Sequence, residues 1–167
     1  MTYVIRGGVE GRERLRLLAE VLAPSTRAFL AEIGVPAGAS CLDVGCGGGD
    51  VTRELARAAG PGGRALGVDL DAVKVEIARR EAAGQGIENV AFDARDVRSW
   101  APKESFDLVY ARFLLNPETL ATPMGKLDRT IIDGTARNRL GTARLRSHCH
   151  PKYGFVRLDY RNLDDSR

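Results

Sequence analysis

Apolar positions along the first two thirds of the chain alternate between helical spacing and short continuous runs. Two apolar stripes at helical spacing predict helices over residues 11–33, divided at Pro24, because proline ends one helix and fits the first turn of the next. The apolar run at residues 40–44 predicts a buried strand. The alternation continues with strands over 65–68, 89–92 and 106–111 and with helices over 51–59 and 72–83.

This alternation predicts an α/β fold. Strands separated by helices of about a dozen residues favour a parallel sheet with helices on both faces. The helical segment within residues 1–38 precedes the first strand and is expected to cap the sheet. In such sheets, ligands bind beyond the carboxyl ends of the strands.

A glycine-rich turn directly follows the first expected strand. The sequence LDVGCGGGD places glycine at Gly45, Gly47 and Gly49. Bare backbone allows a sharp turn and leaves N–H groups and the positive end of the next helix facing a ligand. The dinucleotide pattern GxGxxG would need glycine or alanine at Asp50, so a nicotinamide-dependent reductase is the weaker interpretation. Asp50 is instead expected to cap the following helix.

Carboxylates follow the second and third strands. Asp69 lies 20 residues beyond Gly49 and can accept hydrogen bonds from both hydroxyls of a ribose. The other interpretation, a helix N-cap, suits the neighbouring Asp71 equally well. Asp96, after the third strand, suits the exocyclic amine of an adenine, although a lone loop aspartate is more often simply solvated.

Composition points to one soluble domain and excludes few partners. The chain has 167 residues and a net charge of +3, too little to indicate binding to nucleic acid. It has no apolar stretch long enough to cross a membrane and no secretion signal at its start. Three cysteines do not form a disulfide framework, so a reduced, cytoplasmic protein is expected.

Charge changes sharply near Asn116. Residues 1–115 carry 15 basic and 16 acidic side chains, whereas residues 116–167 carry 10 and 6. We therefore expect a core over 1–115 and an atypical basic tail over 116–167, partly disordered. Candidate strands in the tail are residues 130–132 and 155–158.

Three interpretations of the tail remain open. It is a diverged completion of the sheet, or a largely disordered segment, or the product of a truncation or frame shift near Asn116. The last two leave the sheet incomplete or irregular and expose the apolar fourth strand as an edge. An exposed edge of this kind invites association, here a homodimer across residues 106–111.

Four segments in order resemble motifs of one enzyme family. CLDVGCGGGD, GVDLD, NVAFDARDV and FDLVYARFLL resemble class I S-adenosylmethionine-dependent methyltransferases over residues 3–115. The resemblance implies a Rossmann-like sheet and S-adenosyl-L-methionine as cofactor. It assigns the methionine part to Asp43, Gly45, Cys46, Gly47 and Gly49, the ribose to Asp69, the adenine to Leu70, Asp96 and Val97, and the neighbourhood of the sulfonium to Arg112.

Candidate catalytic chemistry is sparse. Transfer of a methyl group from a sulfonium is an in-line displacement that depends mainly on positioning, and we identify no catalytic base. His148 and His150 flank Cys149 at a spacing unsuited to metal chelation, so no metal is expected. No Asn/Asp-Pro-Pro-aromatic motif is present, which leaves a small-molecule methyl acceptor by elimination. The alternative is a non-catalytic cofactor-binding remnant or regulatory module with an incomplete substrate pocket.

Overall fold

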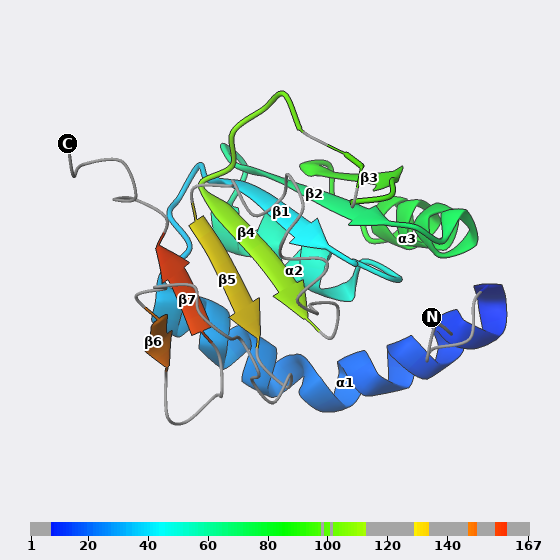
Figure 1. The fold of residues 1–167 in the computed structure, drawn as a ribbon. Helices are drawn as coiled ribbons and strands as arrows, with labels where there is room; N and C mark the ends of the chain where they lie inside the picture. The colour runs from blue at the N-terminus through cyan, green and yellow to red at the C-terminus, as the bar shows by residue number, and fades with distance from the viewer. Residues whose placement is uncertain are drawn as a thin grey trace.

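A seven-stranded sheet organises the protein. The structure, a computed structural model, describes residues 8–97, 99–100, 102–112, 129–133, 147–149 and 156–159. The order across the sheet is β3-β2-β1-β4-β5-β7-β6 (Figure 1). The strands are β1 (Ser40–Val44), β2 (Arg64–Asp69), β3 (Val90–Ala94), β4 (Leu108–Arg112), β5 (Arg129–Asp133), β6 (Ser147–Cys149) and β7 (Val156–Asp159).

The first five strands are parallel, as the alternation of strands and helices predicts. β1 lies in the middle of them, paired with β2 on one side and β4 on the other. Its register sets Val44 beside Val68 and Ala111, so the carboxyl ends of three strands meet at one place. From β1 the chain adds β2 and β3 on one side and then β4 and β5 on the other. The place where the strand order reverses in this way is the switch point at which α/β sheets bind ligands.

Strand β5 corrects the expectation of an exposed fourth strand. β5 pairs with β4 in parallel, from Val109 beside Thr130 to Arg112 beside Asp133. β7 then pairs with β5 antiparallel, and β6 pairs with β7 antiparallel. The candidate strands at 130–132 and 155–158 are thus confirmed. The edge proposed for homodimerisation is not an edge, because β5 satisfies its backbone groups. The division of the chain at residue 115 stays a prediction.

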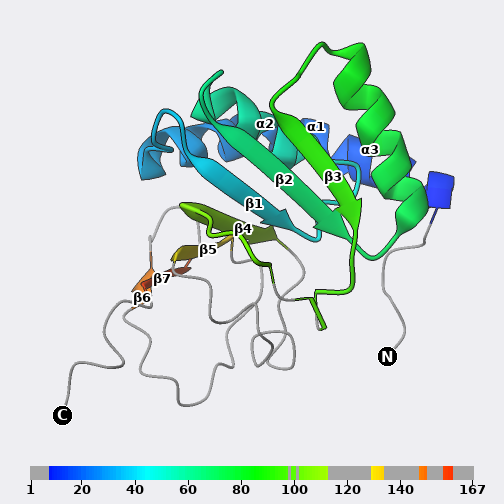
Figure 2. The same ribbon diagram turned by 90° about the horizontal axis from the view of Figure 1, so that it is seen from above.

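Three helices cover one face of the sheet: α1 (Gly8–Ile33), α2 (Asp50–Ala59) and α3 (Ala72–Gly84) (Figure 2). On this face, Phe29 and Leu30 of α1 and Leu55 of α2 pack with Cys41 of β1 and Tyr110 of β4. Farther along, Val75 and Ala78 of α3 pack with Phe92 of β3. Helices were expected on both faces, and the three helices among the described residues all lie on this one.

The opposite face carries the second half of the core. Leu42, Val44, Val68 and Val109 are fully buried there, and Phe106 packs against them from the link before β4. Alternate residues of each strand thus serve opposite faces, the two-residue period expected of a sheet buried on both sides.

Helix α1 is continuous where two helices were predicted. Pro24 lies inside it and is exposed. A proline inside a helix loses one backbone hydrogen bond and costs about 3 kcal/mol relative to alanine. Burial of Phe29 and Leu30, each only 4 % exposed, offsets that cost because tertiary packing outweighs local propensity. The division of residues 11–33 at Pro24 was therefore wrong.

One side-chain amide joins α2 to the start of β2 and β3. The Nδ2 group of Asn89, just before β3, donates to the carbonyl oxygens of Ala56 at 2.9 Å, Gly60 at 2.8 Å and Gly63 at 3.2 Å. These carbonyls lie at the end of α2 and in the turn that follows, where helical hydrogen bonding ends. The carbonyls of Ala56 and Gly60 also accept one backbone N–H each, from Gly60 at 3.2 Å and from Gly63 at 3.0 Å.

We expect Asn89→Ala to lower the free energy of unfolding by about 1–3 kcal/mol, because it removes the side-chain hydrogen bonds to these carbonyls, each with a net contribution of about 0.5–1.5 kcal/mol. Urea denaturation followed by circular dichroism measures the change. Glu88→Ala, at the exposed neighbouring position, is the control and should leave stability within about 0.5 kcal/mol of the parent. Equal effects of the two substitutions would contradict the assignment.

Candidate functional site

The glycine-rich turn is attached to the end of β2 by its backbone. The N–H groups of Gly45 and Cys46 donate to the carbonyl of Val68 at 2.8 and 3.0 Å. The next N–H, of Gly47, donates to the Oδ2 atom of Asp69 at 2.8 Å. Gly47 has a φ of 54°, a conformation that side chains with a Cβ rarely adopt. The turn therefore has its predicted position, fixed beside the strand that carries the predicted ribose ligand.

Asp69 ends β2 and is 3 % exposed. Its Oδ2 atom accepts the bond from Gly47, and its Oδ1 atom accepts from the backbone of Asp71 at 2.9 Å. A carboxylate has about four acceptor positions, so these two bonds leave capacity for ligand hydroxyls. Asp71 caps α3 by accepting from the backbone N–H groups of Val73 and Lys74, which confirms the N-cap role predicted for it. The ribose role of Asp69 stays a prediction.

Asp43 is a second buried carboxylate at this site. It is 3 % exposed, and its Oδ2 atom accepts a hydrogen bond of 2.6 Å from the hydroxyl of Thr52 on α2. Burial raises the pKa of Asp43 to about 6, against the opposing effects of the Thr52 hydrogen bond and the Arg112 charge. The Asp43 carboxyl thus titrates close to neutral pH.

A cavity of about 80 Å³ lies between the turn and α1. Six of the ten predicted site residues line it together, drawn from the ends of β1, β2 and β4 and from the turn. Three α1 residues close its other side, and none of them was predicted as part of the site. The lining is Asp43, Gly45, Cys46, Gly47, Asp69 and Arg112 from the prediction, with Leu15, Leu18, Ala19, Gly48, Asp50, Val51 and Tyr110 in addition.

The other four predicted residues lie outside this cavity. Gly49, with a φ of 74°, packs on β3: a methyl group built on it would lie 2.3 Å from Cε1 of Phe92. Leu70 is 61 % exposed directly after Asp69 and offers an apolar surface there. Asp96 and Val97 follow β3 and are half-buried, and the Asp96 carbonyl accepts from the backbone of Trp100 at 3.0 Å.

Asp50 does not cap α2 as predicted. Gly49 is the N-cap residue and makes no side-chain bond, and Asp50 is the first residue of the helix. The Asp50 carboxylate binds Arg12 of α1 and Arg53 of α2 instead, at 3.0 and 2.7 Å. Two guanidinium groups compete better for this carboxylate than the backbone N–H groups of the helix do.

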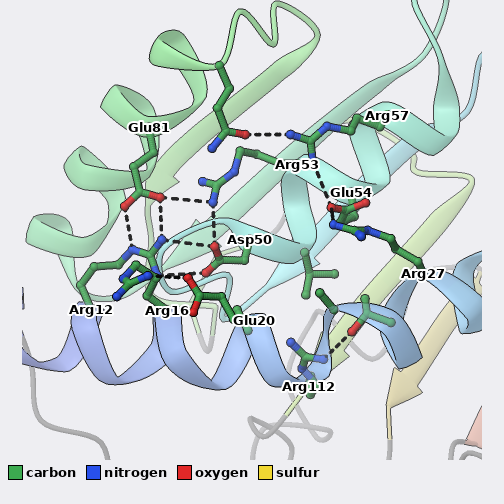
Figure 3. Close-up of a pocket in the computed structure, with 15 residues that line it drawn as sticks. Arg12, Arg16, Glu20, Arg27, Asp50, Arg53, Glu54, Arg57, Glu81 and Arg112 are labelled. Atoms are coloured by element: carbon green, nitrogen blue, oxygen red, sulfur yellow. Dashed lines mark hydrogen bonds and ion pairs between the residues drawn. The ribbon is translucent and has the colours of Figure 1, made fainter.

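A second, larger hollow runs between α1 and α2 (Figure 3). Its volume is about 510 Å³, and it shares Ala19, Asp50, Val51 and Arg112 with the smaller cavity. Six arginines line it. Five of them form ion pairs with the acids of the hollow, which are Glu20, Asp50, Glu54 and Glu81, and the sixth, Arg112, donates a hydrogen bond. Arg112, at the end of β4, donates to the hydroxyl of Thr26 at 2.9 Å and so lies where the two hollows join.

The residues of α1 that line the site were identified in sequence only as an apolar helical stripe. Leu15 and Ala19 are half-buried and Leu18 is 38 % exposed, although a core stripe should be fully buried. The single sequence signal that could have placed them at the site is their position on the helix directly before the glycine-rich strand and turn.

Membrane and metal features are absent from the part of the chain that the structure describes. None of the described helices has the length and apolarity needed to span a bilayer. Nor do three histidine, cysteine or acidic side chains come together among the described residues in a way that could hold a metal ion.

Comparisons with known proteins agree with the geometry of the site. A family model described as a methyltransferase domain matches residues 36–132. The chain is 37 % identical over 93 residues to nocamycin O-methyltransferase of Saccharothrix syringae, covering 55 % of this chain and 33 % of that protein. It is 32 % identical over 119 residues to 2-phytyl-1,4-naphtoquinone methyltransferase of Thermosynechococcus vestitus, covering 71 % of this chain and 50 % of that protein.

A solved structure shows the same fold at low sequence identity. It is the S-adenosylmethionine-dependent methyltransferase of Aquifex aeolicus, with a TM-score of 0.62 and 20 % identity, covering 72 % of this chain and 71 % of that one. The chain spans about a third to a half of the length of the curated relatives it matches. Since the family model covers more than half of its residues, the chain belongs to the methyltransferase-domain family.

Proposed function

We propose that this protein transfers a methyl group from S-adenosyl-L-methionine, the methyl donor of its family, to a small-molecule acceptor. The observation that carries the proposal is the convergence of Asp43, Asp69 and the glycine-rich turn on one cavity at the switch point of the sheet. The curated relatives are named for small acceptors, among them nocamycin and a phytyl naphthoquinone.

The residues present fit this cofactor chemically. Asp43 and Asp69 supply two buried carboxylates for a ligand that carries an ammonium group, a sulfonium and two ribose hydroxyls. The positive φ at Gly45 and Gly47 leaves bare backbone facing the cavity. Leu70 presents its exposed side chain next to Asp69, where an adenine ring would pack, and Asp96 and Val97 follow the neighbouring strand to hold its edge.

The chemistry needs little more than positioning. The bound cofactor supplies a methyl group already activated by the positive charge of its sulfur. Asp43 and Asp69 would hold the methionine part and the ribose of the cofactor at the ends of β1 and β2, while Tyr110 and Arg112 at the end of β4 would orient the acceptor toward the methyl group. Orientation of this kind can supply several kcal/mol of the barrier reduction without a general base.

We also propose that the protein acts in the cytoplasm. Cys41 and Cys46 are free thiols in the structure, as expected in a reducing compartment. Burial raises the pKa of both thiols, so neither is poised to react.

The direct test is turnover. Incubating the purified protein with S-adenosylmethionine carrying a labelled methyl group and a panel of phenolic, quinone and carboxylic acceptors should give a labelled product. Binding of S-adenosylhomocysteine without turnover of any acceptor would favour a non-catalytic binding module. Failure to bind either compound would overturn the proposal.

We expect Asp69→Ala to weaken binding of S-adenosylhomocysteine by about 10- to 100-fold, because the charge-assisted bonds to the ribose are lost. Isothermal titration calorimetry measures the change. Asp93→Ala is the matched control, since Asp93 lies on the adjacent strand and pairs with Arg95 at the surface. Unchanged affinity of the Asp69 variant would remove this residue from the site.

Binding of the cofactor should weaken in acid through Asp43. Its pKa is raised by burial to about 6, so the carboxyl is ionised above that pH and neutral below it. The ionised form attracts a cationic ligand, and therefore affinity for S-adenosylmethionine should fall by about tenfold as pH drops from about 8 to about 5. Asp43→Asn should bind with the weaker affinity at both pH values. A parent protein whose affinity did not change with pH would contradict this role.

A further inference from the structure

Arg12 joins helix α1 to the two helices beneath it. Its side chain is 5 % exposed, and its Nη1 atom lies 3.0 Å from Oδ2 of Asp50, at the start of α2. Its Nη2 and Nε atoms lie 2.5 and 3.1 Å from the two carboxylate oxygens of Glu81 on α3. One buried guanidinium therefore bridges three helices (Figure 3).

Arg53 completes a closed set of four charges with Arg12, Asp50 and Glu81, which we name the Arg12 clamp. Its Nη2 atom lies 2.7 Å from Asp50 and 3.2 Å from Glu81, and its Nη1 atom donates to the Gly48 carbonyl at 3.0 Å. The two positive and two negative charges of the clamp balance. Arg53 also binds the glycine-rich turn directly, through the Gly48 carbonyl. The clamp thus ties α1 to the turn as well as to α2 and α3.

The clamp brings α1 into close contact with the turn. A methyl group built on Gly48 would lie 2.1 Å from Nε of Arg12, and one built on Gly47 would lie 2.8 Å from Cδ1 of Leu15. The cavity left between α1 and the turn measures about 80 Å³. Sites for small molecules usually measure about 300–1,000 Å³, so α1 lies too close to admit a nucleoside cofactor beside the turn.

The two halves of α1 are held by different forces. After Pro24, the helix buries Phe29 and Leu30 in the core. Before Pro24, its leucines and valines are exposed or half-buried, with Leu17 53 % and Val21 77 % exposed. Little apolar burial thus holds the first half. Its described polar attachments to α2 and α3 are the Arg12 clamp and, at its first residue, a hydrogen bond of 2.8 Å from the Gly8 N–H to Asp71. Pro24, which lacks a backbone N–H, marks the boundary between the halves.

We propose that Arg12 is a positioning residue for cofactor binding, which acts through the Arg12 clamp: it holds residues 8–23 across the turn, and these residues must move away for the cofactor to enter and return to cover it. The proposal rests on the proposed function, since it assigns the cofactor to this turn. It predicts that the clamp controls the rates of cofactor entry and release more strongly than it controls affinity.

The test compares Arg12→Gln with Arg16→Gln. Arg16 lies one turn farther along α1, and its ion pairs with Glu13 and Glu20 stay within the same helix. Stopped-flow measurement of S-adenosylhomocysteine binding gives association and dissociation rates. Hydrogen exchange with mass spectrometry reports the opening of residues 8–23, and Arg12→Lys tests whether the charge alone restores the contact.

For Arg12→Gln we expect association, dissociation and exchange of residues 8–23 to rise by roughly 5- to 150-fold, the range of ordinary coupling between sites. Arg12→Lys should bring these rates part of the way back to those of the parent, and Arg16→Gln should have the rates of the parent. Raising sodium chloride from about 0.05 to about 0.5 M should change these rates little in the parent, because the Arg12 side chain is 5 % exposed and buried ion pairs are screened only weakly.

Two outcomes would overturn the proposal in distinguishable ways. Unchanged rates and exchange in Arg12→Gln, with binding intact, would mean that the clamp does not restrain α1, although the cofactor assignment would stand. A parent protein that binds no S-adenosylhomocysteine would overturn the proposed function and, with it, the role of α1 in cofactor entry. Hydrogen exchange would in that case still measure whether Arg12 holds the helix.

Discussion

Three consecutive N–H groups of the glycine-rich turn, from Gly45 to Gly47, are held by acceptors at the end of β2. The Val68 carbonyl accepts two of them, and the Asp69 carboxylate accepts the third. A turn built of glycines has little conformational preference of its own and loses much conformational entropy when it becomes ordered. The three hydrogen bonds offset part of that cost. The neighbouring strand therefore fixes its shape, and with it the start of α2. Asp43 and Thr52 depend on the same attachment, because one lies just before the turn and the other just after it.

The site is charged inside and thinly covered by apolar groups. Two buried carboxylates line the cavity, and two arginines and two acids join the helices next to it. Buried charges are costly unless they are paired or hydrogen-bonded. The arginines and acids of the clamp pair across separate helices, whereas Asp43 and Asp69 accept hydrogen bonds from a hydroxyl and from backbone N–H groups. Ion pairs of this kind fix the relative positions of the helices more than they raise the free energy of unfolding. The arrangement suits the proposed methyl transfer, since orientation of a charged cofactor is the main contribution that this reaction would require.

Sequence reasoning predicted the parallel core and six of the thirteen residues that line the cavity, because those features are local. Residues 40–44 are a buried run followed by glycines, and Asp69 and Asp71 follow the next strand in a short motif, so spacing alone placed them. It failed where distant partners decide the outcome. Arg12 captures Asp50 from another helix, and the packing of Phe29 and Leu30 carries α1 through Pro24. β5 was seen only as a candidate strand, because pairing across the sheet has no local signal.

The contact between Gly49 and Phe92 links two positions that the chain separates by a helix, a strand and a second helix. Only a hydrogen at position 49 leaves room for the aromatic ring on β3. A larger residue at 49 would require a smaller one at 92, and the reverse change would leave a void under the turn. The size of the side chain that fits at position 92 therefore depends on glycine at position 49, and the φ of 74° at Gly49 disfavours any other residue there whatever space is made.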